Sequence, residues 1–310
     1  MKHLLGSFLI FAAAFLFAET KVVCTTLPVT AVTKAVLNGL PEYEITVLLP
    51  SIAGCPHDYS LTPADVKRLS GAQIIVVNGG GMEGFLDGVI GRICPGAKIV
   101  DASKGILPPV HDHTAKEESC GHDDHDHHGC GHHHEHHHNE HILASPAMTE
   151  RAVSSIGAQF LHLTKSPGER AAIENNVKTY SGELKKIVRE YEDFARSVPP
   201  SEKRVLVQHS IFDYLAKEAG FDVKGSIFLH DMQEPSASEA AKLIRMIRKE
   251  RISAIFAEPD KRSRMTDMIA KEGRVPVIYL QANVTSDDPG DMLRMFRNDL
   301  QTLRKAVRAK

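Results

Sequence analysis

Short, uninterrupted apolar segments separated by helical stretches limit the folds open to this 310-residue chain more than any other feature. Segments that are apolar on both faces and alternate with helices are typical of parallel sheets covered by helices on each side. The segments fall into two sets, one before residue 102 and one after residue 203. The sequence therefore predicts an α/β protein of two similar lobes, with strands at residues 21–26, 44–49, 73–78, 98–101, 204–208, 222–227, 253–257 and 275–280.

Helical patterns fill the intervals, and one predicted helix is much longer than the others. Residues 166–169 (Ser-Pro-Gly-Glu) form a capping box with proline at the first helical position, and Val198-Pro199-Pro200 ends the helix. The apolar residues between them recur at the period of one helical face, at Ile173, Val177, Tyr180, Leu184, Ile187, Tyr191 and Phe194. About 28 residues make a rod of roughly 42 Å, which can run along both lobes. The shorter helices are predicted at residues 28–40, 62–69, 82–92, 210–219, 236–250 and 289–307.

The first 18 residues have the pattern of an export signal. Lys2 and His3 precede an apolar run at residues 4–17, and Ala18 offers a small residue for cleavage. The run is short for a membrane span, although a retained N-terminal anchor helix is the alternative. We therefore divide the chain into a signal peptide (1–18), a first α/β lobe (19–165), a rigid linking helix (166–198) and a second α/β lobe (199–310).

Charge and cysteine content narrow the class further. The chain has 37 Lys and Arg against 39 Asp and Glu. It therefore lacks the surplus of basic residues that would indicate nucleic-acid binding. Its odd number of cysteines leaves at least one thiol unpaired even in an exported protein. Cys24 lies in an apolar run and is expected to be a small buried side chain. The other four are Cys55, Cys94, Cys120 and Cys130, and the last two can pair with each other or bind metal.

Histidines are concentrated in one polar segment. Residues 111–141 hold 13 of the 18 histidines, mixed with acidic residues, glycine and two cysteines. A segment with so few apolar residues is expected to be a mobile loop, which we place at residues 111–138. Its neutral imidazoles are ligands for Zn²⁺, Cu²⁺ or Ni²⁺ and predict several weak, exchangeable sites. The alternative is a solvated insert without a role.

Two motif matches have simpler explanations. Residues 134–138 fit the H-E-x-x-H pattern of zinc proteases, but a match is expected by chance in a segment this rich in histidine. Residues 79–84 fit the G-x-G-x-x-G pattern of dinucleotide sites, yet they follow the third predicted strand instead of the first. A tight turn between a strand and a helix accounts for these glycines.

Three further stretches carry histidine where a strand ends or a helix begins. They are residues 54–61, which contain His57, residues 141–146, which begin with His141, and residues 207–215, which contain His209. Loops at the carboxyl ends of parallel strands are where α/β proteins place ligand sites. The three histidines are therefore candidates for one site between the lobes.

Read in order, these and several other motifs resemble the zinc/manganese solute-binding proteins of ABC importers, most closely their zinc-uptake branch. The resemblance covers nearly the whole chain after residue 18, and a His-rich loop before the second motif is itself a feature of the zinc members. The matching motifs are Pro-His-Asp-Tyr at 56–59, Pro-Ala-Asp at 63–65, Met-Glu-Gly-Phe-Leu at 82–86, His141 with Pro146, His209 through Tyr214, Glu-Pro-Ser at 234–236 and Ile-Phe-Ala-Glu-Pro at 255–259.

The resemblance implies a metal site in the cleft, with His57, His141 and His209 as ligands. The aspartate that many members use as a fourth ligand is missing here, because Gln281 stands at the matching place. Three imidazoles and a water suit tetrahedral Zn²⁺, whereas Mn²⁺ prefers more oxygen ligands. Gln281 is a possible fourth ligand. Glu258 is expected to support an imidazole N–H or, equally, to form a salt bridge.

The resemblance implies a periplasmic, high-affinity zinc-binding protein, monomeric and not an enzyme. It would deliver Zn²⁺, as its transported ligand, to the membrane permease and ATPase of an ABC importer. Three alternatives remain open at this point: a periplasmic zinc buffer or chaperone, a binding protein for manganese or another divalent metal, and a zinc hydrolase with Glu258 as its base. One of the histidines at 136–138 can also replace His141 as the second ligand.

Overall fold

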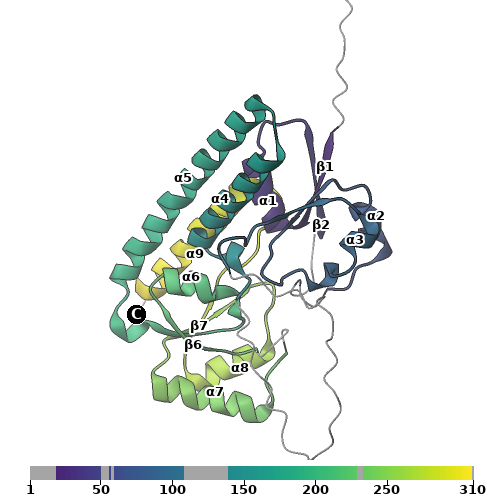
Figure 1. Cartoon of the computed structure of the whole chain (residues 1–310). Helices are drawn as coiled ribbons and strands as arrows, with labels where there is room; N and C mark the ends of the chain where they lie inside the picture. Colours follow the sequence, from purple (N-terminus) through teal and green to yellow (C-terminus); the bar gives the residue numbers. More distant parts are fainter. Residues whose placement is uncertain (1–18, 50–55, 57–58, 108–138, 229–232, 309–310) are drawn as a thin grey trace, which may run out of the picture.

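The computed structural model describes residues 19–49, 56, 59–107, 139–228 and 233–308 (Figure 1). The predicted signal peptide, His57 and the predicted loop at residues 111–138 lie outside these residues. Among the described residues, no helix is both long and apolar enough to cross a membrane.

Two four-stranded parallel sheets form the lobes, and both have the same plan. The first has the order β2-β1-β3-β4 and the second the order β6-β5-β7-β8. The α/β fold of two similar lobes is thus confirmed. The strands are β1 (Thr20–Thr26), β2 (Tyr43–Leu49), β3 (Ile74–Val77), β4 (Lys98–Asp101), β5 (Arg204–Val207), β6 (Asp222–Ser226), β7 (Ala254–Ala257) and β8 (Val277–Tyr279).

Helices cover the sheets and join the lobes. They are α1 (Leu27–Val36), α2 (Pro63–Leu69), α3 (Ile90–Ile93), α4 (Pro146–Leu163), α5 (Pro167–Ser197), α6 (Asp213–Glu218), α7 (Ala237–Glu250), α8 (Arg264–Gly273) and α9 (Pro289–Arg308). The short 3₁₀ turns are η2 (Gly84–Leu86), η3 (Ile142–Ala144), η4 (Pro200–Glu202) and η5 (Ser210–Phe212).

Some helix predictions from the sequence were wrong. The helix predicted at 82–92 is divided into η2 and α3, because Gly88 between them has a φ of 67°. A residue with a positive φ cannot continue a right-handed helix. The first helix ends at Val36 and not at residue 40, and two helices, α4 and α8, lie where no element was predicted.

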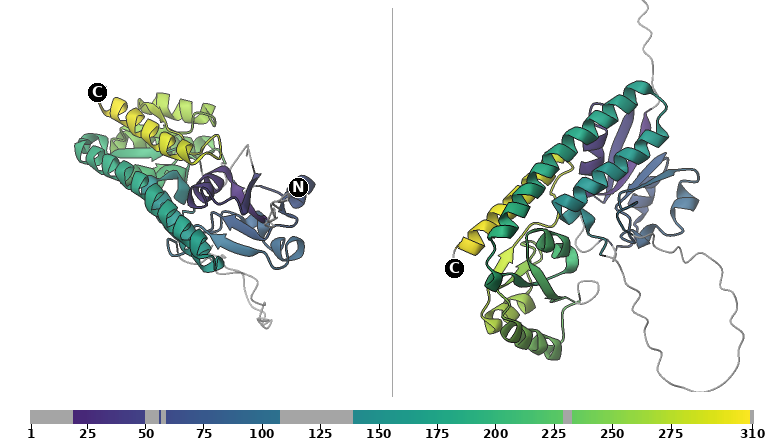
Figure 2. Two further views of the ribbon diagram at one scale, coloured as in Figure 1. Left: turned by 90° about the horizontal axis from the view of Figure 1, so that it is seen from above. Right: turned by 60° about the vertical axis from the view of Figure 1, so that its left-hand side comes forward.

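Helix α5 is the predicted long helix and runs along both lobes (Figure 2). Its 31 residues make a rod of about 46 Å. The Ser166 side chain caps the first turn by accepting a hydrogen bond from the Glu169 N–H at 3.4 Å. Helix α4 lies beside the N-terminal half of α5 and α9 beside its C-terminal half. The predicted apolar face is buried at Ile173, Tyr180, Leu184, Ile187, Tyr191 and Phe194.

The largest of three buried apolar clusters in the described residues extends through both lobes. It includes Val22 and Val100 of the first sheet, Leu184 of α5 and Val205 of the second sheet. Helix α9, the last described helix, packs on α1, the first described helix, as well as on α5. The Tyr191 hydroxyl donates a hydrogen bond to the Phe296 carbonyl at 2.8 Å and so fixes α9 on α5. The two lobes are therefore held together by shared helices.

Candidate metal centre

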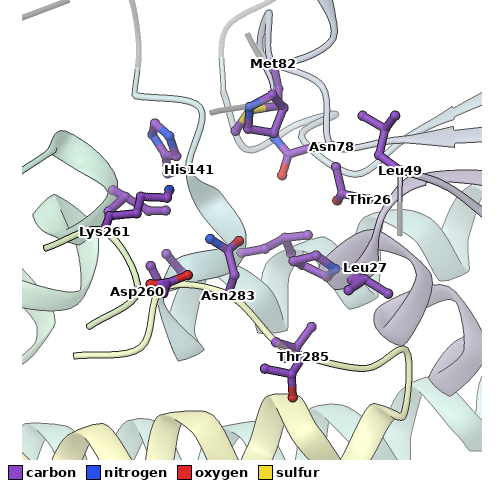
Figure 3. A pocket seen from close by; sticks show the side chains of 17 residues that line it. Thr26, Leu27, Leu49, Asn78, Met82, His141, Asp260, Lys261, Asn283 and Thr285 are labelled. Carbon is purple, nitrogen blue, oxygen red and sulfur yellow. The ribbon is translucent and has the colours of Figure 1, made fainter. Parts of the chain in front are cut away.

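A cavity of about 330 Å³ lies between the lobes (Figure 3). The first lobe lines it at the carboxyl ends of β1 and β3, with Thr26 and Asn78, and the second lobe with Lys261 and Asn283. In both sheets the order of strands reverses direction beside the first strand, and α/β proteins place ligands at such points. The cavity is therefore where the topology predicts a binding site.

Two of the three predicted histidine ligands lie together beside this cavity. His141 lines the cavity from the segment before η3, and His209, two residues after β5, packs against His141. Their ring centroids are 4.9 Å apart with the ring planes at 88°. The two residues are only 5% and 6% exposed, so the pair is shielded from solvent although it comes from distant parts of the sequence.

The third predicted ligand, His57, lies outside the described residues, and so do the histidines of 111–138. Pro56, next to His57, lines the cavity. Within the described ranges, no three His, Cys, Asp or Glu side chains converge on a single point. The described part of the chain thus brings together two of the three predicted ligands.

The segment that carries His141 is held by both lobes. The Asn78 side chain donates a hydrogen bond to the Glu140 carbonyl at 2.8 Å from the first lobe. From the second lobe, the Tyr214 hydroxyl donates to the Asn139 carbonyl at 2.7 Å. Asn139 Oδ1 in turn lies 2.9 Å from His141 Nδ1. None of these polar partners was predicted from the sequence.

Glu258 forms a salt bridge, which is the second of the two roles predicted for it from the sequence. Its Oε1 lies 3.0 Å from Lys261 Nζ, and the carboxyl group is almost completely buried. Burial raises the pKa of Glu258, while Lys261 acts in the opposite direction. The Glu258 backbone N–H donates to Gln208 Oε1 at 3.2 Å, which ties the ends of β5 and β7 together beside His209.

Gln281, the possible fourth ligand, lies in an extended segment after β8 and is exposed. In this segment Ala282 and Val284 are buried, and they line the cavity together with Asn283. The Gln281 backbone N–H donates to Asp299 Oδ1 at 2.8 Å. Asn283, which was not predicted, is thus the amide of this segment that lies at the cavity wall.

The glycine-rich turn after β3 is explained by packing. Gly79, Gly80 and Gly81 all have positive φ angles, and a side chain at Gly79 would collide with Asp101 and Ser103. Glu83 fixes this turn, because its carboxylate accepts hydrogen bonds from the backbone N–H groups of Asn78 and Gly79 at 2.7 and 3.0 Å. Burial raises the pKa of Glu83 to about 7. The dinucleotide pattern is therefore a structural turn, as the sequence indicated.

Comparison with known proteins identifies the family to which this chain belongs. The sequence profile described as "Zinc-uptake complex component A periplasmic" matches residues 22–306. This chain belongs to that zinc-uptake family. It is 28% identical over 283 residues to the high-affinity zinc uptake system protein ZnuA of Yersinia pestis, covering 87% of this chain and 85% of that protein. It is 30% identical over 252 residues to ZnuA of Bacillus subtilis (strain 168), covering 81% and 74%.

Solved structures agree with the zinc-uptake family at the level of the fold. A crystal structure of ZnuA superposes with a TM-score of 0.73 at 22% identity, covering 93% of this chain and 99% of that one. The SBP FpvC from Pseudomonas aeruginosa, in complex with Mn²⁺, superposes with a TM-score of 0.76 at 20% identity, covering 94% and 99%. Solved structures that share this fold include complexes with Mn²⁺ and with Ni²⁺.

The described cysteines of this zinc-uptake family member are buried thiols. Cys24 lies in β1, and burial raises the pKa of its thiol to about 12. The Cys94 thiol donates to the Leu69 carbonyl at 2.9 Å. A thiol with a raised pKa is a poor metal ligand, so Cys24 acts as a small core side chain, as the sequence indicated. Cys55, Cys120 and Cys130 lie outside the described residues.

Asp299 of α9, which holds Gln281, should make stability depend on pH. Burial raises the pKa of Asp299 to about 8, so the folded chain binds this proton more tightly than the unfolded chain. The contribution to stability is complete below about pH 4 and is lost as the pH rises through about 8. We expect Asp299→Asn to raise the free energy of unfolding at pH 8.5 by about 1–3 kcal/mol and to change it little near pH 4.5.

Urea unfolding at the two pH values measures this effect. Asp193→Asn, on the exposed side of α5, is a matched control for the loss of one carboxylate and should show no such gain at high pH. An equal effect of Asp299→Asn at both pH values would mean that the carboxyl group does not titrate in this range.

Proposed function

We propose that this chain is the periplasmic, high-affinity zinc-binding component of an ABC importer. It would bind Zn²⁺ in the cleft between the lobes and deliver it, as a monomer, to the membrane permease and its ATPase. The observation that carries the proposal is the pair of buried imidazoles, His141 and His209, at the carboxyl ends of the strands in a member of the zinc-uptake family. The signal peptide is proposed to be cleaved near Ala18.

The proposed ligands are His57, His141 and His209, with Zn²⁺ as the cargo. Zn²⁺ is commonly four-coordinate, and neutral imidazole is one of its preferred ligands. The fourth position would be taken by water, by Gln281 or by an imidazole of residues 111–138. A site with three neutral nitrogen ligands favours Zn²⁺ over Mn²⁺, which binds better to carboxylate oxygens.

The shared core supports a particular way of releasing the metal. Because α5 runs along both lobes and α9 packs on α1, a wide hinge opening would break apolar contacts of the core. Release would instead require small shifts of the segments that carry the ligands, such as residues 139–141 and His209 before η5. The His-rich segment 111–138 would collect zinc for the cleft when supply is low.

The ion pair of Glu258 supports a binding protein over a hydrolase. A zinc hydrolase requires a base that is free to take a proton from the attacking water. Glu258 is buried against Lys261 at 3.0 Å, and its N–H is bonded to Gln208. This carboxylate therefore has a structural partner on its own lobe and is a poor candidate for that base.

A zinc titration of the protein with and without residues 111–138 tests the proposed function. We expect the complete chain to bind several zinc ions weakly and one tightly, because the loop and the cleft supply different ligand sets. Deletion of the loop should remove the weak sites and leave one tight site per chain. Competition with a chromogenic chelator measures both classes. If the deletion abolished all tight binding, the cleft would not be the zinc site.

A further inference from the structure

Asn139 is the residue that joins the two described imidazole segments. Its backbone carbonyl and its side chain both bond to the second lobe, although it precedes His141 by only two residues. Asn139 Nδ2 donates to the Ser210 carbonyl at 2.7 Å and approaches Asp213 Oδ2 at 3.3 Å. On its other side, Asn139 Oδ1 accepts from the His141 backbone N–H at 3.0 Å and lies 2.9 Å from His141 Nδ1.

The partners of the amide fix which way it points. The Ser210 carbonyl can only accept a hydrogen bond, so it must face the NH₂ group of Asn139. The His141 backbone N–H can only donate, so it must face the amide oxygen. These two contacts hold independently of the charge on Asp213 and leave one orientation of the side chain.

The orientation of the amide fixes the tautomer of His141. An amide oxygen accepts but cannot donate, so His141 Nδ1, at 2.9 Å, must carry the proton. The carboxylate of Glu140, at 3.8 Å from the same nitrogen, favours this state too. The lone pair of the neutral ring therefore resides on Nε2. A ligating histidine whose other nitrogen donates to a fixed acceptor is oriented and made more basic toward the metal.

The same amide also controls the distance between the two imidazoles. Ser210 follows His209 directly in the chain, so Asn139 holds the backbone beside His209 while it holds the ring of His141. Glu140 lies between Asn139 and His141 in the sequence, and its carbonyl accepts a hydrogen bond at 2.8 Å from the Asn78 side chain of the first lobe. One side chain thus sets both the direction of one imidazole and its separation from the other.

We propose that Asn139 is the positioning residue of the cleft site, selecting the Nδ1–H tautomer of His141 and setting the spacing of His141 and His209 across the lobes. The proposal rests on the proposed zinc-binding function. It assigns no contact between Asn139 and the metal. A residue with this role is expected to affect zinc affinity by about 10- to 100-fold, the usual cost of losing a partner of a ligating histidine.

Two substitutions in the complete chain separate the two roles. Asn139→Ala removes both the acceptor for His141 and the donor to Ser210, so tautomer selection and spacing should both be lost. Asn139→Asp keeps the acceptor but loses the donor and sets a carboxylate against Asp213. It should keep the Nδ1–H tautomer and still weaken zinc binding. Adding Asp213→Asn to Asn139→Asp restores an amide–carboxylate pair across the lobes and should recover part of the affinity.

Two measurements read out the roles. Competition with a chelator gives the affinity of the tightest site, and long-range ¹H–¹⁵N NMR spectra of the metal-free chain report the tautomer of each imidazole. The His141 signals are identified by their absence in His141→Gln. Asn176→Ala is the matched control, because this amide also holds two backbone carbonyls, those of Val36 and Asn38, at a distance from the cleft. It should change neither measurement.

The outcomes distinguish this proposal from the proposed function. If the unsubstituted chain binds one zinc ion tightly and Asn139→Ala leaves both its affinity and the His141 tautomer unchanged, the positioning role is wrong while zinc binding stands. If the unsubstituted chain lacks a tight site, the proposed function itself fails. A tenfold or greater loss in Asn139→Ala, with a mixed tautomer and partial rescue of Asn139→Asp by Asp213→Asn, supports the assignment.

Discussion

Replacing His209 by alanine is expected to weaken the tightest zinc site by about 100-fold or more. The free energy of zinc binding to four-ligand protein sites is about 10–16 kcal/mol, so each ligand accounts for roughly 3 kcal/mol, and every 1.4 kcal/mol is a factor of ten. His209 is buried against His141, with 4.9 Å between ring centroids, so no other described imidazole can take its place. Chelator competition on the complete chain measures the change.

A histidine away from the cleft provides the control. His162 is exposed near the C-terminal end of α4, and His162→Ala removes an imidazole without touching the cavity. It should leave the tightest site unchanged. Substitution of His57 by alanine extends the test to the ligand that lies outside the described residues. Equal affinities of His209→Ala and His162→Ala would show that zinc is held elsewhere.

Replacing Gly220 by alanine is expected to destabilise the fold by about 2–5 kcal/mol. Gly220 follows α6 with a φ of 81°, a conformation that costs a residue with a side chain about 1–2 kcal/mol. A Cβ at this position would also lie 2.9 Å from Cα and 3.0 Å from the carbonyl oxygen of Ala195 in α5. Such backbone overlap costs a further 1–3 kcal/mol, because α6 would have to move away from α5. Chemical denaturation measures the loss.

Gly182 in α5 gives a matched control of opposite sign. A Cβ at Gly182 would meet no atom within 4 Å, and the residue lies inside a helix. Alanine is the better helix former, so Gly182→Ala should stabilise the fold by about 0.5–1 kcal/mol. If the two substitutions had similar effects, the close approach of α6 to α5 would not limit stability. Zinc affinity of Gly220→Ala should fall too, because α6 carries Asp213 and lies beside η5.

The sequence predicts those parts of the fold that depend on local patterns. The strands and α5 were found because continuous apolar segments and a repeated helical face are visible without knowing any contact. The prediction of one helix at 82–92 was wrong because Gly88 interrupts it. The composition of the segment does not reveal that Gly88 has a positive φ, which is set by the turn around it. Helix α4 was not predicted, because the small and polar residues between Val153, Ile156 and Phe160 weaken the apolar pattern of its buried face.

The candidate site was predictable in part for the same reason. His141 and His209 were found because they lie next to elements whose ends a parallel sheet brings together. Asn139 was not found, because it lies at the edge of a histidine-rich segment and its role comes from contacts with Ser210 and Tyr214, about seventy residues away. The same holds for Lys261 and Asn283 at the cavity wall. The metal-binding roles of His57, His141, His209 and Gln281 stay predictions.

The packing of α9 on α1 and α5 has a consequence for the order in which the molecule can form. The ribosome makes α1 and α5 well before α9, so the faces of these two helices that pack on α9 stay uncovered until the twenty residues of α9 are available. An incomplete chain that stops before residue 289 exposes the apolar faces of Leu184, Tyr191 and Val32 to water. Such a chain is a good substrate for chaperones and proteases. We therefore expect the presence of α9 to decide whether a partly made chain is protected from proteases.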